Sequence, residues 1–386
     1  MKKFTVLQVI PDFNSGGVER GTFEIASYLQ KHKVKNFVCS NGGSLVSSLK
    51  EIGVKHIKMS VHSKNPIIII LNAIRLYKNI KEKQIDIVHA RSRAPAWSCY
   101  LACLLSGRKF VTTFHGAYSA SHPLKRFYNS IMLKGQRVIA ISNYIKKHIE
   151  TRYHFTSPNL VVIERGADLN YFNPDNLDKT RIENIKKELG LSELDPKEKL
   201  IILPSRFTRL KGHLYLIKSL KYLTTKKFKC LMVGKAGPAQ SDYLNEIKQA
   251  IREYKLEDKI IIKDEAISDM PALYSIADLV VSSSVEPEGF GRTIVEAQAM
   301  RRIVISTNIG APQDIIEQGK SGFLVPTSDA STFAESIEKA LNLKKEQAKE
   351  ITDYAHKLVS KKYSLDLMCK NTLKLYQKIF DEHEGE

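Results

Sequence analysis

Short runs of apolar residues alternate with longer amphipathic stretches along the whole chain of 386 residues. In the first half the runs are rich in Val, Ile and Phe and lie at 4–10, 37–40, 85–90, 110–114, 138–141 and 160–163. The second half repeats the pattern at 200–204, 230–234, 260–263, 279–284, 303–306 and 323–325. Short buried strands that alternate with helices indicate parallel sheets covered by helices on both faces. The pattern predicts an α/β fold of two doubly wound domains with a cleft between them.

A polar and charged stretch at 170–199 separates the two halves and contains two prolines. This stretch predicts a linker and a surface helix. We therefore expect an N-terminal domain at 1–170 and a C-terminal domain at 171–362. The last segment, 363–386, has leucines at helical spacing and predicts a final helix.

The most informative local motif follows the apolar run at 279–284. In Glu288-Gly-Phe-Gly-Arg-Thr-Ile-Val-Glu296, the first glutamate falls in a strand-to-helix loop and the second about one and a half turns into the helix. A helix rises ~1.5 Å per residue, so the two carboxylates can reach opposite ends of a ligand as long as a nucleotide sugar. Gly289, Gly291 and the free N–H groups of the helix start offer an anion site. Two glutamates alone are more often solvated side chains. The loop of Gly289 and Gly291 and the apolar residues after Glu296 favour a ligand-binding site.

A second motif, Ser205-Arg206-Phe-Thr-Arg-Leu-Lys211-Gly212, follows the run at 200–204. Arg206 and Lys211 fall in one strand-to-helix loop, at the end of a strand where ligands bind in such sheets. Arginine can hold a phosphate bidentately, while lysine acts as a point charge. Either cation alone is more often a surface residue. Their shared position favours a diphosphate.

Two motifs in the first half are less specific. Gly16 and Gly17 follow the first strand, where a glycine pair serves packing as often as binding. The sequence around them departs from Gly-x-Gly-x-x-Gly, which argues against a dinucleotide enzyme. His115 follows the strand at 110–114, and its position alone does not distinguish a ligand contact from an ordinary loop residue.

Together these motifs resemble the retaining glycosyltransferases of the GT-B architecture, which has two Rossmann-like domains, and in particular family four (glycosyl transferases group 1). The resemblance covers nearly the whole chain and is most specific between Arg206 and Glu296. It implies that Arg206 and Lys211 bind the donor diphosphate, that Glu288 meets hydroxyls of the donor sugar, and that Glu296 accepts hydrogen bonds from the ribose. The catalytic residues it implies are Glu288, His115, Arg206 and Lys211, and the donor-binding residues are Gly16, Gly17, Gly289, Phe290, Gly291, Thr293 and Glu296.

The resemblance carries further expectations. The final helix at 363–386 should pack back on the N-terminal domain, and neither a cofactor nor a metal ion should be required. His89, at another strand end, would be structural or lie near the acceptor. The chain departs from the family pattern at Arg165, where many relatives have Asn, and at Asp314, where relatives often have Glu.

The net charge of +19 is distributed unevenly. Residues 1–170 contain 26 Lys and Arg against 9 Asp and Glu, whereas residues 171–386 contain 34 against 32. The surplus is either a solvated surface or a site for a polyanion, such as nucleic acid or an anionic membrane. At 64–83 and 125–147 basic residues alternate with Ile, Leu, Phe and Tyr at helical spacing, which is typical of docking at a membrane surface. We therefore prefer the membrane surface and expect no nucleic acid.

Several classes of protein are disfavoured. No run of 18 apolar residues predicts a membrane-spanning helix, and Gln8, Pro11 and Asp12 interrupt any export signal. The five scattered cysteines lack a Cys-x-x-Cys pair, so we expect neither a disulfide framework nor a metal site built from them. The leading hypothesis is a glycosyltransferase that acts on a lipid-linked or lipopolysaccharide-type acceptor, peripheral on the cytoplasmic face of the membrane. The alternatives are a sugar-nucleotide epimerase or phosphorylase on the same fold, and a non-enzymatic, basic nucleic-acid-binding protein.

Overall fold

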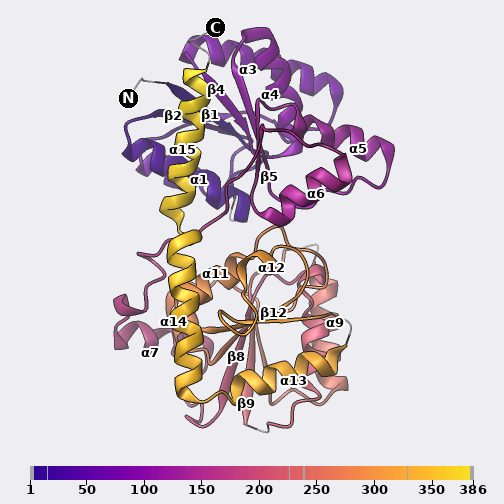
Figure 1. Cartoon of the computed structure of the whole chain (residues 1–386), viewed down its shortest axis with the longest axis vertical. Coiled ribbons are helices and arrows are strands. Elements are labelled where there is room, and N and C mark those ends of the chain that lie inside the picture. Colours follow the sequence, from indigo (N-terminus) through magenta and orange to yellow (C-terminus); the bar gives the residue numbers. More distant parts are fainter. Residues whose placement is uncertain (1–3, 15, 226, 238–239, 328, 383–386) are drawn as a thin grey trace. The chain divides into compact units, whose positions relative to one another are not determined.

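The computed structural model describes residues 4–14, 16–225, 227–237, 240–327 and 329–382. The chain divides into two compact units, one formed by Met1–Arg165 with Leu365–Glu386 and the other by Gly166–Ser364. Each unit contains one parallel sheet with helices packed on both of its faces (Figure 1). The predicted α/β fold with two doubly wound sheets is confirmed.

The first unit contains a seven-stranded sheet in the order β3-β2-β1-β4-β5-β6-β7. Its strands are β1 (Thr5–Val9), β2 (Lys35–Ser40), β3 (Lys55–Lys58), β4 (Ile87–Ala90), β5 (Lys109–Phe114), β6 (Arg137–Ala140) and β7 (Leu160–Val162). All neighbouring strands are parallel. The strand order reverses between β1 and β4, and ligands bind beside such a reversal, at the carboxyl ends of the strands.

The helices of the first unit are α1 (Gly17–Lys31), α2 (Val46–Glu51), α3 (Pro66–Lys83), α4 (Arg93–Ser106), α5 (Pro123–Ser130), α6 (Asn143–Tyr153) and α15 (Leu365–Asp381). The last of these comes from the C-terminal end of the chain and packs on α1 (Figure 1). Buried Tyr376 and Ile379 of α15 share one apolar core with Val6 and Ile139 of the sheet. The final helix is therefore part of the first unit.

The second unit contains a six-stranded sheet in the order β10-β9-β8-β11-β12-β13. Its strands are β8 (Lys199–Pro204), β9 (Phe228–Val233), β10 (Ile260–Lys263), β11 (Leu279–Ser282), β12 (Ile303–Thr307) and β13 (Phe323–Val325). Its helices are α7 (Lys179–Leu189), α8 (His213–Leu220), α9 (Ser241–Glu253), α10 (Met270–Ser275), α11 (Arg292–Ala299), α12 (Pro312–Ile315), α13 (Ala330–Leu341) and α14 (Lys345–Lys362). The order of this sheet reverses between β8 and β11, the strands that precede the two most specific sequence motifs.

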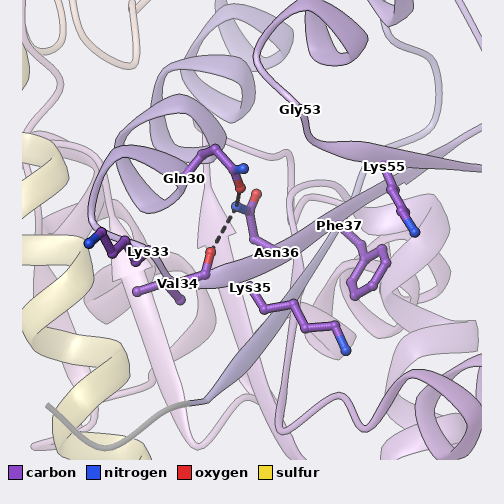
Figure 2. A pocket seen from close by; sticks show the side chains of 8 residues that line it. All are labelled: Gln30, Lys33, Val34, Lys35, Asn36, Phe37, Gly53 and Lys55. Carbon is purple, nitrogen blue, oxygen red and sulfur yellow. Dashed lines mark hydrogen bonds between the residues drawn. The ribbon is translucent and has the colours of Figure 1, made fainter.

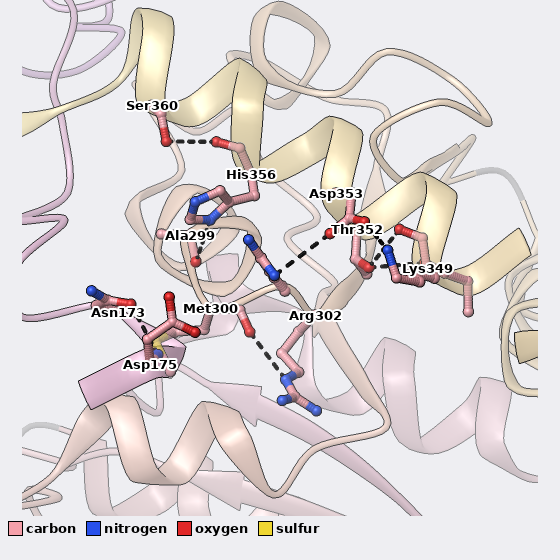
Figure 3. A network of polar contacts seen from close by, with 12 residues as sticks. Asn173, Asp175, Ala299, Met300, Arg302, Lys349, Thr352, Asp353, His356 and Ser360 are labelled. Atoms are coloured by element: carbon pink, nitrogen blue, oxygen red, sulfur yellow. Dashed lines mark hydrogen bonds and ion pairs between the residues drawn. The ribbon is translucent and has the colours of Figure 1, made fainter. Parts of the chain in front are cut away.

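A polar network fixes the C-terminal end of α11 (Figure 3). His356 of α14 donates from Nδ1 to the carbonyl oxygen of Ala299, at 2.8 Å. The Nε atom of Arg302 donates to the carbonyl oxygen of Met300, at 3.2 Å. These bonds satisfy carbonyl groups that a helix end leaves without partners. They hold the C-terminal end of α11, the helix that contains Glu296.

Of the helices that the structure describes, none combines the length and the apolar character needed to cross a bilayer.

Candidate active site

Two strand-to-helix loops of the second unit lie side by side. One follows β8 and contains Arg206 and Lys211, and the other follows β11 and contains Glu288. The strands β8 and β11 are direct neighbours in the sheet. The hydroxyl of Ser283 donates to the carbonyl oxygen of Lys211 at 3.0 Å, and the N–H of Val285 donates to the carbonyl oxygen of Leu210 at 2.9 Å. The two predicted motifs are therefore bonded into one structure.

The closeness of the two loops depends on Gly212. This residue has a φ of 67°, in the left-handed region that favours glycine. A Cβ atom placed on it would lie 1.9 Å from the carbonyl oxygen of Ser283. A side chain therefore does not fit here unless the loop that bears Lys211 moves away from the strand end.

Lys211 and Glu288 form an ion pair across the two loops. Lys211 Nζ lies 2.8 Å from Glu288 Oε2, and their side chains are 19% and 11% exposed. The hydroxyl of Ser284 donates to the other carboxylate oxygen, Oε1. Burial alone would raise the pKa of Glu288, but the charge of Lys211 and the hydrogen bonds from Lys211, Ser284 and Ser282 outweigh it and lower the pKa below its ordinary value of 4.5. Glu288 is thus an ionised, oriented acceptor.

This pKa shift predicts how stability depends on pH. Because the pKa of Glu288 is lower in the folded state, its ionised form stabilises the fold above the unfolded pKa, and this contribution is lost as the pH falls through the folded pKa. Glu288→Gln removes the contribution. The difference in free energy of unfolding between the wild type and Glu288→Gln should be largest near pH 7 and shrink below about pH 4. Urea unfolding at pH 7, 5, 4 and 3.5 measures it, and a difference that stays constant with pH contradicts the assignment.

The second glutamate, Glu296, is buried inside α11. The phenol of Tyr274 donates to its Oε2 at 2.9 Å, and Arg292 Nε lies 3.4 Å from its Oε1. Its carboxylate therefore lies beside a cation and is held in one orientation by these two contacts. Sequence reasoning did not single out Arg292, although its spacing of four residues from Glu296 on a helix signals such a pair. Nothing in the local sequence of Glu296 points to Tyr274, which comes from α10.

The residues between the glutamates differ in what they offer a ligand. Gly291 has a φ of 126° and is the N-cap of α11. The N–H groups of the first helical turn point toward this end of the helix. Phe290 is buried, with its ring centroid 5.9 Å from that of Tyr363, so its side chain belongs to the core. Gly289 and Thr293 are partly exposed.

The three cations near β8 have different surroundings. Arg206 is exposed, and among the described residues it forms no ion pair with either glutamate. Arg209, in contrast, pairs with Glu246 at 2.7 Å and lies over the ring of Tyr243. Within the second unit the structure therefore brings Lys211 and Glu288 into contact and leaves Arg206 open to solvent.

In the first unit, the glycine pair begins α1, with Gly16 as the N-cap and Gly17 as the first helical residue. The guanidinium of Arg165 donates to the carbonyl oxygen of Gly17. A Cβ atom on Gly21 would lie 2.3 Å from the same guanidinium, so this glycine makes room for the cation. The cation of Arg165 thus lies against the loop that contains Gly16 and Gly17.

The two strand-end histidines of this unit have different environments. His89 is fully buried and bonded at both ring nitrogens, to the Tyr376 hydroxyl at 2.6 Å and to the Thr113 hydroxyl at 2.7 Å. It joins β4, β5 and α15 and is structural. His115 instead has a buried Nε2 that no hydrogen bond reaches from the described residues. Burial, followed by the charges of Arg91 and Arg165, lowers the pKa of His115 well below 6.5, so its ring is neutral at pH 7.

Two of the cavities in the first unit lie at opposite ends of its sheet. One, of about 430 Å³, lies at the amino ends of β2 and β3, and its lining includes three lysines, Lys33, Lys35 and Lys55 (Figure 2). The other, of about 460 Å³, lies at the carboxyl ends of β1–β3, beside the glycine loop. Five of its lining side chains are polar, Asp12, Asn14, Asn41, His56 and Lys58, and Gly42, Gly43 and Val46 complete the lining. Of these two cavities, the second lies at the sheet end where such folds bind ligands.

Matches to known proteins extend over most of the chain. Residues 15–171 match the family model Glycosyltransferase Family 4, and residues 183–358 match Glycosyl transferases group 1. A glycosyltransferase from Rickettsia africae ESF-5 is similar in structure, with 42% identity, a TM-score of 0.91 and coverage of 98% of this chain and 99% of that one. Anabaena HepE in complex with UDP-glucose shares the fold, with 20% identity, a TM-score of 0.83 and coverage of 97% and 99%. Spore coat protein SA of Bacillus subtilis is 23% identical over 307 residues, 78% of this chain and 80% of that protein.

These matches favour sugar transfer over the epimerase, phosphorylase and nucleic-acid-binding alternatives, while the roles of the individual site residues stay predictions. The chain belongs to the group 1 glycosyltransferases of family four, enzymes of GT-B fold that transfer a sugar from a nucleotide-sugar donor.

Proposed function

We propose that this enzyme transfers a sugar, with retention of anomeric configuration, from a nucleoside-diphosphate sugar to a lipid-linked or lipopolysaccharide-type acceptor. We also propose that it works peripherally at the cytoplasmic face of a membrane. The observation that carries the proposal is the Lys211–Glu288 pair, which lies at the sheet reversal between two loops bonded to each other. A structural neighbour, WaaG, is described as a glycosyltransferase involved in lipopolysaccharide biosynthesis, which supports the acceptor class.

The chemistry needs charge stabilisation at the leaving group. The bond from the anomeric carbon to the phosphate oxygen breaks, and a bond from the acceptor oxygen forms on the same face of the sugar. The acceptor proton passes to the departing phosphate oxygen. Lys211, Arg206 and the N–H groups at the start of α11 are the groups that would stabilise the charge growing on the diphosphate. Glu288 would accept hydrogen bonds from the donor sugar, and Glu296 from the ribose.

We further propose that no metal ion or cofactor takes part. Lys211 and Arg206 supply the positive charge that a divalent cation provides to diphosphates in other enzymes. The polar cavity beside the glycine loop would receive hydroxyl groups of the acceptor, because its carboxylate, amides and imidazole can each bond to them.

The test is a thermal-shift screen of UDP-, GDP- and ADP-sugars, run with and without EDTA. A ligand at 100 times its dissociation constant stabilises the folded protein by about 2.7 kcal/mol. We expect one nucleotide class to raise the melting temperature by several degrees, equally in both buffers. Arg206→Ala should lose most of this shift without a change in the melting temperature of the free protein, since Arg206 is exposed.

Arg209→Ala is the matched control, because this arginine of the same loop is already paired with Glu246, and its shift should equal that of the wild type. A shift that survives Arg206→Ala, or that EDTA abolishes, contradicts the proposed site.

Once a donor is known, NMR of the product shows its anomeric configuration. An inverted product rules out the retaining mechanism, and turnover of the donor without any acceptor points to an epimerase.

A further inference from the structure

Helix α3 presents apolar side chains to solvent. Ile67, Ile70, Leu71 and Ile74 are 69%, 55%, 47% and 44% exposed, and their spacing places them on one face of the helix. Asn72 lies on the opposite face and is 1% exposed, with its amide donating to the carbonyl oxygen of Ser60 at 3.0 Å. In the first half of this helix Asn72 and Ala73 therefore lie inside, and the large apolar side chains of Ile67, Ile70, Leu71 and Ile74 lie outside.

Further exposed hydrophobic side chains lie on the helices that neighbour α3. Of the thirteen large hydrophobic side chains that are exposed among the described residues, nine belong to α3, α4 and α5. Helix α4 joins the other two, because Ser98 donates to the carbonyl oxygen of Ile69 on α3 and Trp97 donates to that of Tyr128 on α5. On α5, Leu124 and Phe127 are 73% and 66% exposed. We call this surface of α3, α4 and α5 the apolar face.

The segment of sequence that contains the apolar face is strongly basic. Residues 52–149 contain 17 Lys and Arg but only two acidic residues, Glu82 and Asp86. On α3 the row of exposed isoleucines is followed, at the same helical spacing, by exposed Lys78 and Lys81. Lys125 and Arg126 stand beside the exposed apolar residues of α5. Such a surface suits a ligand that is apolar in its interior and negatively charged at its surface.

We propose that the apolar face docks on an anionic phospholipid bilayer. Isoleucine and leucine side chains enter the boundary between headgroups and acyl chains, while the flanking lysines and arginines meet the phosphates. Long basic side chains reach such headgroups from an apolar surface. This inference deepens the proposed function, because it names the surface by which the enzyme reaches a membrane-bound acceptor.

Two other occupants fit less well. A second copy of the chain, paired symmetrically through this face, would place the basic residues of both copies against each other. A nucleic acid would use the positive charge and aromatic stacking platforms, whereas the exposed hydrophobic residues of α3 and α4 are aliphatic and Phe127 is the one aromatic among those of α5. The bilayer is the ligand that uses both the charge and the aliphatic residues.

The single tryptophan of the chain provides a reporter at this face. Trp97 lies on α4, half-buried, with its ring centroid 5.5 Å from that of exposed Phe127. The full-length protein should bind vesicles of phosphatidylcholine with 30% phosphatidylglycerol, and its fluorescence should shift to the blue and be quenched by brominated acyl chains. Vesicles of phosphatidylcholine alone should bind at least tenfold more weakly. Raising the salt from 50 to 300 mM should weaken the anionic binding by a similar factor.

Two sets of variants separate the apolar from the electrostatic contribution. The triple variant Ile67→Gln, Ile70→Gln and Ile74→Gln should lower the vesicle partition coefficient at least tenfold at every salt concentration. Lys78→Gln with Lys81→Gln should weaken binding at low salt and flatten the salt dependence. The matched control, Lys361→Gln with Lys362→Gln at the exposed end of α14, removes the same charge from the second unit and should bind like the wild type.

The outcome is decided by binding measured on folded protein. All the changed side chains are exposed, so melting temperatures should match that of the wild type. Two results overturn the proposal. One is vesicle binding that persists in the triple isoleucine variant. The other is a wild-type protein that does not bind anionic vesicles but forms a dimer or binds RNA through this face. The assay needs no sugar nucleotide. Failed vesicle binding with an intact donor thermal shift therefore rejects only the docking surface, and the reverse result rejects only the proposed chemistry.

Discussion

Lys211→Ala should reduce kcat/KM for sugar transfer by about 10²–10³-fold. Removing one group that stabilises charge in a transition state typically costs this factor, and Lys211 is the cation held at the end of β8 by bonds to the neighbouring loop. Most of the loss should appear in kcat, because the charge on the departing diphosphate is greatest in the transition state. Initial rates at several donor concentrations measure both constants.

The same substitution should lower the free energy of unfolding. It leaves the buried carboxylate of Glu288 without its cation, which costs up to about 3–5 kcal/mol when a buried pair is broken. We expect about 2–3 kcal/mol here, since Ser284 and Ser282 still donate to Glu288 and the carboxylate can take up a proton. Urea unfolding at pH 7 checks this value.

Arg209→Ala serves as the control, because it removes a cation two residues away that pairs at the surface with Glu246. It should leave both transfer and stability close to those of the wild type. If Lys211→Ala retains wild-type kcat, or if the two variants lose activity equally, Lys211 does not act on the leaving group.

The sheets were predictable because buried parallel strands are short, continuous apolar runs. The strand missed by this criterion is β3, whose sequence Lys55-His-Ile-Lys58 contains one apolar residue and has an exposed lysine at each end. It is an edge strand that pairs with β2, and neither of its middle residues is fully buried. One apolar residue in four does not distinguish a strand from a loop.

The site was partly predictable for a related reason. Loops after parallel strands meet at one end of a sheet, which is why Arg206 and Lys211 could be expected near Glu288. The ion pair between Lys211 and Glu288 could not be expected, because it depends on β8 and β11 being neighbours and on a bond from Ser283. The contact of Tyr274 with Glu296 likewise depends on how α10 packs.

The face of α3 shows a different limit of pattern reasoning. A run of five consecutive apolar residues at 67–71 carries no periodicity of its own, so it does not say which side of the helix is buried. In the structure the buried side of α3 contains Asn72, Ala73, Leu76 and Ile80, while Ile67 and Ile70 are exposed. Basic and apolar residues could be seen to alternate here, but which side of the helix is exposed required the structure.

Gly212→Ala should be about as damaging to transfer as the loss of Lys211, although it removes no functional group. A Cβ atom at this position would lie 1.9 Å from the carbonyl oxygen of Ser283, so the loop has to move by about 1 Å or more to relieve the contact. Misplacement of a catalytic group on this scale costs about 10²-fold in rate. Lys211 precedes Gly212 directly and would move with it.

Gly190→Ala is a matched control for the strain in this experiment. Gly190 ends α7 with a φ of 70°, almost the same as the 67° of Gly212, but a Cβ atom there would meet nothing within 4 Å. Both substitutions carry the cost of a left-handed backbone, about 1–2 kcal/mol, and only Gly212→Ala adds overpacking, about 1–3 kcal/mol more. Gly190→Ala should therefore keep wild-type kcat and lose only the smaller amount of stability. Equal kcat values in the two variants would show that the contact between the loops does not position Lys211. A loss of kcat confined to Gly212→Ala would assign the effect to the space that this glycine leaves beside Ser283.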